Sequence, residues 1–310
     1  MRSWLFASCT VLIGCGSVSE QPKDAAVDSA VDVPRDVAVD TPAPRCNPTA
    51  PFGSGTPVAE LNSPQHDNFV WLTSDELTAY LSSQRTGGLG GYDIYVATRT
   101  SKTAAFGTPQ LLSTANTAMD ESRPSLSSDG LTLYAAQAQS NGQFKIVSAT
   151  RTSTTAAFGA FSLVVDLNTT SVDIYDADPE LAANGTAYFS STRGGNADLY
   201  AATKNGTGFN GPLPVSASDI ASPSFDGCVV ISPDELTIFF CSNRTGGAGA
   251  FDMYMSQRSS VAVAFPAVTR LATLSSASNE QPSWISADGC LLYYSTGTTQ
   301  NDIYVAQRGM

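Results

Sequence analysis

Short stretches in which apolar and polar residues alternate recur along most of the chain, and each predicts a β-strand. One kind is rich in aromatic and β-branched residues and occurs at residues 92–99, 144–151, 197–204, 251–258 and 301–308. A second kind precedes it and reads LTAYLSS, LTLYAA, TAYFSS, LTIFFCS or LLYYST. No amphipathic helix is predicted between these strands, so the pattern indicates an all-β domain.

Two further signatures complete each repeat. A tight turn, in which the side chain of Asp or Asn bonds its own backbone and a following Gly accepts a positive φ, precedes the second kind of strand at Asp75, Asp129, Asn184, Asp234 and Asp288. A Phe followed by a small or turn residue leads into another strand at Phe52, Phe106, Phe158, Phe209 and Phe265. Copies lie 50 to 55 residues apart and each holds four short strands, which predicts a five-bladed β-propeller.

The order of the signatures predicts how the ring closes. The chain enters the first repeat on the Phe-Gly strand at 52–61 and leaves the last one at Arg308, without a further Phe-Gly strand. Because an unpaired outer edge exposes backbone hydrogen-bonding groups, we expect residues 52–61 to supply the outer strand of the fifth blade.

The repeat resembles a known group. The segment ISPDELTIFFCSNRTGG followed by FDMY, at 231–254, is similar to the WD-like repeats of TolB and related periplasmic proteins. The resemblance covers residues 52–308 and implies the fold, but such repeats occur in proteins with different duties. TolB itself has six blades and an additional domain that engages partners of the Tol envelope system, so the resemblance of five repeats does not imply that role.

The amino-terminal residues predict a lipoprotein signal. Residues 1–14 combine Arg2 with an apolar run too short to cross a bilayer, and Leu12-Ile13-Gly14-Cys15 resembles the lipobox of bacterial lipoproteins. We therefore expect cleavage before Cys15 and its acylation, and Gly16 at the next position favours the outer membrane. Residues 15–45 repeat Asp among Ala, Val and Pro and predict a disordered tether, which leaves 46–310 for the propeller.

Charge and residue inventory exclude several function classes. The formal net charge of −12 argues against nucleic acid and against direct adhesion to anionic lipid, so we expect membrane contact only through the lipid anchor. His66 is the single histidine, and the sequence has neither a Gly-x-Ser-x-Gly elbow nor a Cys-x-x-Cys pair. We therefore predict no catalytic triad, zinc site or bound cofactor.

Four cysteines are left once those of the signal and the anchor, Cys9 and Cys15, are set aside. In an oxidising compartment such cysteines are expected to form disulfides. Cys228 and Cys241 flank the Asp234-Glu235 turn symmetrically, which places them on adjacent strands and predicts a disulfide. Elimination then pairs Cys46 with Cys290, beside the closing strand.

In three blades an Arg ends the second strand and an Asp begins the third. We expect a charge-assisted hydrogen bond across each hairpin, with a structural role, between Arg85 and Asp93, Arg193 and Asp198, and Arg244 and Asp252.

Acidic residues in the loops before the innermost strands form the candidate ligand rim. They would surround the mouth of the channel at which these strands begin, and they are Asp67, Asp120, Glu121, Asp176, Asp178, Asp226 and Glu280. Such a ring predicts sugar or calcium binding in a lectin-like protein, with Tyr175 and Trp284 as aromatic platforms. Glycoside hydrolysis needs a carboxylate pair, but every blade carries an acid and none stands out.

The favoured hypothesis is a non-enzymatic envelope lipoprotein whose propeller is a scaffold for protein–protein interaction. Its partner would be an envelope protein or a glycan. Sugar or calcium binding is the alternative, and hydrolysis is a less favoured one.

Overall fold

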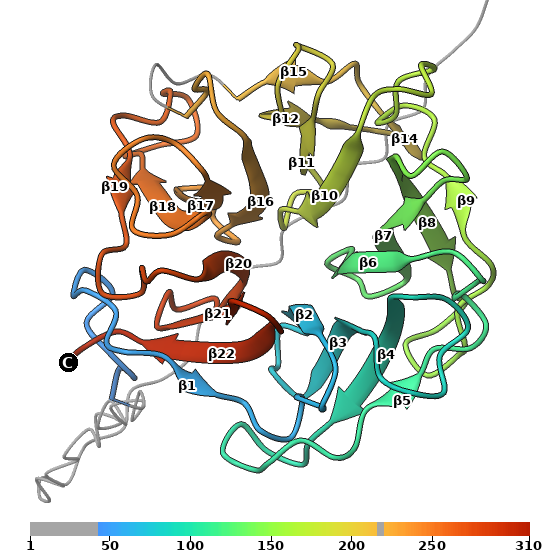
Figure 1. Ribbon diagram of the computed structural model, residues 1–310, viewed down its shortest axis with the longest axis horizontal. Coiled ribbons are helices and arrows are strands. Elements are labelled where there is room, and N and C mark those ends of the chain that lie inside the picture. Colours follow the sequence, from blue (N-terminus) through green and yellow to red (C-terminus); the bar gives the residue numbers. More distant parts are fainter. Residues whose placement is uncertain (1–42, 216–219) are drawn as a thin grey trace, which may run out of the picture. The chain divides into compact units, whose positions relative to one another are not determined.

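The computed structural model describes residues 43–215 and 220–310, and its strands form five blades around a central channel (Figure 1). Each blade is a four-stranded antiparallel sheet whose innermost strand borders the channel. Blade 1 contains β2 (Asp67–Leu72), β3 (Thr78–Ser83), β4 (Asp93–Thr98) and β5 (Gln110–Leu111). Blade 2 contains β6 (Glu121–Leu126), β7 (Thr132–Ala138), β8 (Phe144–Thr150) and β9 (Ser162–Leu163). The five-bladed all-β prediction is confirmed.

The remaining blades repeat the order. Blade 3 contains β10 (Asp176–Leu181), β11 (Ala187–Ser191), β12 (Asp198–Ala202) and β15 (Leu213–Pro214), and blade 4 contains β16 (Asp226–Ile231), β17 (Thr237–Ser242), β18 (Asp252–Gln257) and β19 (Thr269–Arg270). Blade 5 contains β20 (Asn279–Ile285), β21 (Leu291–Gly297), β22 (Asp302–Gln307) and β1 (Thr56–Pro57). A separate hairpin consists of β13 (Lys204–Asn205) and β14 (Gly208–Phe209). In the described part of the chain no helix is long and apolar enough to cross a membrane.

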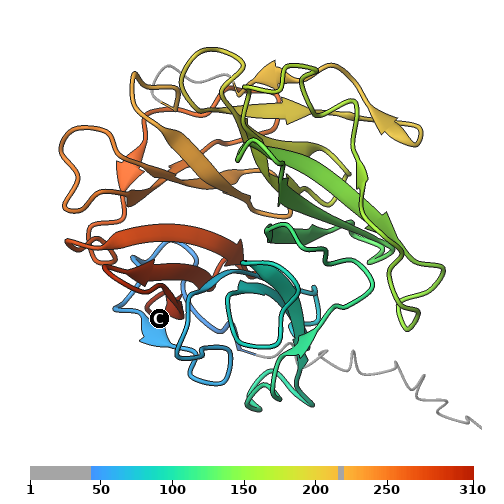
Figure 2. The ribbon, with the colours of Figure 1, turned by 45° about the vertical axis from the view of Figure 1, so that its right-hand side comes forward.

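The amino-terminal segment closes the ring, as predicted. Strand β1 pairs antiparallel with β22, with Thr56 opposite Val305, and the two lie side by side in Figures 1 and 2. The predicted Cys46–Cys290 disulfide is present, with a Cα–Cα distance of 5.6 Å. Beside it, Arg45 donates hydrogen bonds of 2.8 Å to Glu76 of the first turn of blade 1 and to Asp288 of blade 5. The closure therefore combines a strand, a disulfide and an ion-pair cluster.

Apolar side chains on both faces of each sheet pack between neighbouring blades. Leu81 and Ile303 belong to one such cluster between blades 1 and 5, and Ile238 and Leu199 to another between blades 3 and 4. Full burial of side chains of this size contributes about 1.5–3 kcal/mol each. The core is thus divided into layers that hold the innermost strands at fixed positions around the channel.

The turns after the innermost strands have the predicted backbone. Gly130, Gly185 and Gly289 have φ of 67°, 85° and 69°, but blades 1 and 4 carry Glu76 and Glu235 there, at 62° and 58°. The strain is offset by contacts that a Gly cannot make. Glu235, for example, accepts a 2.8 Å hydrogen bond from the hydroxyl of Tyr188 in blade 3.

The predicted arginine pairs are wrong. Arg85 donates to Asp67 of the innermost strand at 2.7 Å, and Arg193 and Arg244 bond Asp176 and Asp226 in the same way. The reason is that Ser83 accepts a 2.8 Å bond from Nε of Arg85 and directs the guanidinium inward. Asp93 instead accepts bonds from the backbone N–H groups of Leu89 and Gly90, and Asp252 does so from Ala248 and Gly249.

Candidate functional site

Five of the seven predicted rim acids lie at the starts of the innermost strands, where they are buried and already bound within the protein. They are the first acidic residues of the innermost strands: Asp67, Glu121, Asp176, Asp226 and Glu280. Each accepts a hydrogen bond from the backbone N–H of a preceding loop residue, namely Ser63, Thr117, Thr169, Ser222 or Ser276. Three also bind an arginine, and Asp176 binds Lys145 at 2.9 Å in addition. Carboxylates engaged in this way fix the loops, and we do not propose them as ligand groups.

The other two rim acids lie in different places. Asp120 is half-buried and accepts a 3.0 Å hydrogen bond from the backbone N–H of Tyr92. Asp178 lies two residues inside β10 and lines a small space that all five innermost strands border. The seven acids therefore do not form one open ring.

A ring of strained residues narrows the channel. At the third residue of the innermost strand, blades 1 to 4 have a positive φ: Phe69 (48°), Arg123 (58°), Asp178 (57°) and Cys228 (53°). The strand pairing shifts register at each of these positions, and blade 5 places Pro282 there. We call these five residues the constriction ring. They line a space of about 20 Å³, which holds about one water.

Side chains of the constriction ring bind one another across blades. Arg123 forms an ion pair with Asp178, and its guanidinium lies 4.0 Å from the ring centre of Phe69. Asp178 also accepts a 2.9 Å hydrogen bond from the backbone N–H of Cys228 and a bond from the hydroxyl of Ser190. Burial lowers the pKa of Arg123, but a guanidinium stays charged at neutral pH. The network explains how four strained residues persist together.

A large cavity opens on the other side of the constriction ring, where the innermost strands end. We call this opening the turn mouth, because it is bordered by the second residues of all five first turns: Ser74, Ser128, Ala183, Pro233 and Ala287. The cavity has a volume of about 660 Å³. Its walls are largely apolar and include Trp71, Leu126, Leu181, Ile231 and Trp284. It also extends between blades 1 and 2, past Tyr80 and Phe158.

Glu180 lines both this cavity and the constriction, and it breaks the repeat. The strand pairing places Trp71, Ser125, Val230 and Trp284 at its position in the other blades. The residue is 7 % exposed, and its side chain makes no hydrogen bond or ion pair with any residue of the described ranges. Burial raises the pKa of its carboxyl well above the usual value.

Other charged groups at the cavity have partners. Asp75 and Asp129 accept hydrogen bonds of 2.6 Å from the first residue of their own turns, Thr73 and Ser127, and these bonds lower the pKa of both carboxyls. Arg151 donates to the carbonyl of Gly130 at 2.8 Å and lies over the ring of Phe158. Glu180 is thus the acid in this part of the molecule that is buried and unpaired.

Sequence reasoning named Asp178 and Trp284 but missed Arg123, Glu180 and Phe69. The available signal was departure from the repeat, because the position of Phe69 and Arg123 carries a different residue in each blade and the position of Glu180 is an acid in blade 3 alone, whereas the rim acids recur. The bulges hid the signal, since they change which side chains border the channel.

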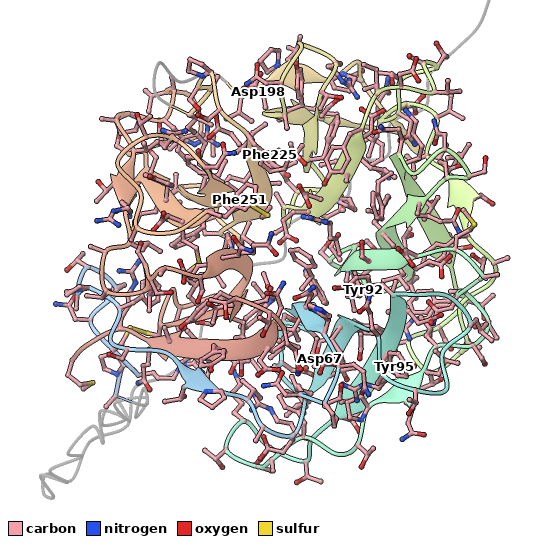
Figure 3. The ribbon with its side chains drawn as sticks, in the orientation of Figure 1. Asp67, Tyr92, Tyr95, Asp198, Phe225 and Phe251 are labelled. Atoms are coloured by element: carbon pink, nitrogen blue, oxygen red, sulfur yellow. A yellow bond between two sulfur atoms is a disulfide. The ribbon has the colours of Figure 1, made fainter. Side chains whose placement is uncertain are left out.

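Half-buried aromatic rings gather at the strand-start mouth, the opposite end of the channel. Phe144, Tyr175, Phe225 and Phe251 follow one another edge to face, with ring centres 6.1, 6.4 and 5.3 Å apart. Figure 3 shows Tyr92, Phe225 and Phe251 around the channel. Because Trp284 lines the turn mouth instead, the two expected platforms, Tyr175 and Trp284, do not share a site.

The remaining predicted residues are placed as follows. Cys228 and Cys241 form the expected disulfide, with a Cα–Cα distance of 5.4 Å. Cys15 lies outside the described residues. Within residues 43–215 and 220–310 there is no group of three or more His, Cys, Asp or Glu that could hold a metal ion. His66 accepts a 3.2 Å hydrogen bond from the backbone N–H of Asn301.

No protein-family model and no curated protein matches this chain. Solved structures do resemble it. TolB from Acinetobacter baumannii is 16 % identical with a TM-score of 0.51, and the match covers 81 % of this chain and 57 % of that one. The chain is a five-bladed β-propeller. The catalytic domain of a family 62 α-L-arabinofuranosidase from Coprinopsis cinerea is 13 % identical, with a TM-score of 0.54 and coverage of 84 % and 98 %.

An endo-arabinase from Bacteroides thetaiotaomicron is similar to the same degree, with 14 % identity, a TM-score of 0.53 and coverage of 84 % and 97 %. The propeller thus resembles both TolB and glycoside hydrolases. At such identities the likeness concerns the fold alone, and the site has to carry any functional argument.

Proposed function

We propose that this protein is a ligand-binding propeller that holds a small organic molecule in the cavity at the turn mouth, without covalent chemistry of its own. The observation that carries the proposal is the buried, unpaired carboxyl of Glu180 in a largely apolar cavity of about 660 Å³. Sites for small molecules have about this volume and combine apolar walls with a few polar groups.

We place this binding protein in the cell envelope, at the outer membrane, through acylation of Cys15. The lipobox-like residues before Cys15 support this proposal. The two disulfides support an oxidising compartment, because disulfides persist in such compartments.

Binding is favoured over hydrolysis by the state of the carboxyl groups. Glycoside hydrolysis usually needs two carboxyl groups that are free to act on the substrate. Asp178, two residues from Glu180, is held by Arg123, Ser190 and the backbone N–H of Cys228. Asp75 and Asp129 belong to turn motifs that recur in other blades. Among the acids described at the cavity and the constriction ring, Glu180 therefore has no second free carboxyl group with which to form a catalytic pair.

A cavity-filling variant tests the proposal. Ala183 is exposed and lines the turn mouth, so Ala183→Trp obstructs the entrance without disturbing the core. Full-length protein in detergent would be screened by calorimetry against amines, sugars and short peptides. We expect at least one class to bind, with affinity lost in Ala183→Trp and retained in Ala262→Trp, an exposed control outside the cavity. Binding that survives Ala183→Trp, or release of reducing sugar from arabino-oligosaccharides, would contradict the proposal.

Docking of an envelope protein is the second candidate, and a groove beside blade 2 favours it. Three apolar side chains there are largely exposed: Leu163 (55 %), Val165 (77 %) and Val172 (67 %). They border a groove of about 610 Å³. Co-purification of a stoichiometric envelope protein with the wild type, lost in Val165→Lys, would support this candidate, whereas equal recovery with both proteins would reject the groove.

A further inference from the structure

We propose that the cavity at the turn mouth selects an organic cation, whose ammonium group pairs with Glu180 while its apolar body rests against the tryptophan-lined wall. This inference rests on the proposed function, because it names the chemical class of the ligand in the same cavity. It begins from a difference between blades: the position that is Trp, Ser or Val elsewhere is an acid only in blade 3.

A buried acid without a partner is costly in its ionised form, because an apolar surrounding cannot replace its hydration. Within the described ranges no cation contacts Glu180. Arg123, the arginine of the constriction ring, is paired with Asp178. Arg151 lies farther out and is bound to Gly130 and Phe158. An ammonium group brought in by a ligand would supply the missing partner.

The rest of the cavity favours positive charge as well. Asp75 and Asp129 line the turn mouth, and hydrogen bonds from Thr73 and Ser127 lower the pKa of both carboxyls, so both are ionised at neutral pH. Trp71 and Trp284 line the wall, and tryptophan rings attract cations on their faces. An anionic ligand would meet the two ionised acids at the turn mouth and would find no cationic partner at Glu180.

Binding of an ammonium ligand displaces a proton from Glu180. Burial raises the pKa of the Glu180 carboxyl and so favours its protonated form in the free protein. When an ammonium ligand binds, the proton leaves to solvent and the carboxylate pairs with the cation. Binding of the cation therefore weakens as the pH falls, whereas binding of a neutral ligand of the same shape does not.

The test compares phenethylamine with phenethyl alcohol, which share a skeleton and differ in charge. Calorimetry would use full-length protein in detergent, at neutral pH, in two buffers of different ionisation enthalpy. We expect the amine to bind at least about tenfold more tightly than the alcohol, with an enthalpy that depends on the buffer because a proton is released. Glu180→Gln should abolish this preference, and Glu60→Gln, an exposed control outside the cavity, should retain it.

The outcomes separate the two proposals. Equal affinity for amine and alcohol, both lost in Ala183→Trp, would overturn the cation preference and leave ligand binding intact. If neither probe binds, both proposals fail for ligands of this size. Glu180→Asp, which keeps the charge but withdraws it from the cavity, should weaken the amine and spare the alcohol, and unchanged amine binding in that variant would also overturn the inference.

Discussion

Glu180 lies where the other blades carry Trp71, Ser125, Val230 and Trp284. A repeated residue maintains the blade, whereas a residue that occurs in one blade cannot be explained by the blade alone. Glu180 also lacks any partner among the described residues, so its burial costs stability. At the scale of single residues, this combination is the strongest indication of a function.

The pH dependence of stability tests the state of Glu180. Burial raises its folded-state pKa above the unfolded value, so its contribution is fully present below about pH 4 and is lost as the pH rises through the folded-state pKa. Glu180→Gln should therefore gain stability over the wild type as the pH rises, and the gain should level off above that pKa. Urea unfolding at several pH values measures this difference. A pH-independent difference, like the one expected for Glu60→Gln, would contradict the assignment.

Glu235 gives a second prediction at this scale. Replacing it with Gly would relieve a backbone strain of about 1 kcal/mol but remove charge-assisted hydrogen bonds from Tyr188 and Asn184, worth about 1.5–3 kcal/mol each. We expect Glu235→Gly to lower the free energy of unfolding by about 2–5 kcal/mol, and Glu235→Gln to lower it less. Urea unfolding measures this free energy. If Glu235→Gly instead raises it, the contacts that Glu235 makes between blades 3 and 4 are weak.

Near the start of each innermost strand lies an acid that holds the preceding loop, but the partners of this acid differ between blades. Asp176 binds Arg193 and Lys145, both largely buried, whereas Glu280 has no cationic partner among the described residues. The acid near the start of the innermost strand therefore stabilises some blades more than others. Lys145 belongs to blade 2, so its ion pair with Asp176 also links blade 2 to blade 3.

This difference predicts unequal costs of neutralisation. Asp176→Asn leaves two buried cations without their charge partner, a loss of about 3–5 kcal/mol. Glu280→Gln retains an acceptor for Ser276 and should cost about 1 kcal/mol. Chemical denaturation near neutral pH measures the free energy of unfolding of both variants. Similar losses for the two would mean that water or other polar groups stabilise the charges of Arg193 and Lys145 in Asp176→Asn.

The strands and their closure could be predicted because each signature occurs five times and constrains the others. The partner of Arg85 could not be predicted, because it depends on Ser83, which turns the guanidinium of Arg85 toward the innermost strand. The constriction ring was equally hidden. Its positive φ values fall on Phe69, Arg123, Asp178 and Cys228, which are not residues that indicate a left-handed backbone.

At the scale of the whole molecule, closure joins the two ends of the propeller domain. The Cys46–Cys290 disulfide spans 244 residues, whereas Cys228–Cys241 spans 13. The former therefore restricts the unfolded chain far more, by about 5–6 kcal/mol against about 3 kcal/mol in the chain-entropy view.

Removal of each disulfide tests this ranking. We expect the Cys46→Ser/Cys290→Ser pair of substitutions to lower the denaturation midpoint more than Cys228→Ser/Cys241→Ser. The melting temperature of each full-length variant measures the loss. A larger loss for the second pair would indicate that packing at the constriction ring, rather than loop length, determines the contribution of the disulfides.

The position of Cys46 also determines how the domain responds to mechanical force. Cys46 precedes Phe52 and β1 along the chain, so tension applied to the amino-terminal segment reaches the Cys46–Cys290 bond before it reaches the closing strand. A covalent bond extends little, and the hydrogen bonds between Thr56 and Val305 are therefore shielded from the pull. If Cys15 is anchored in a membrane, drag on the propeller would stretch the tether and leave the blades in register.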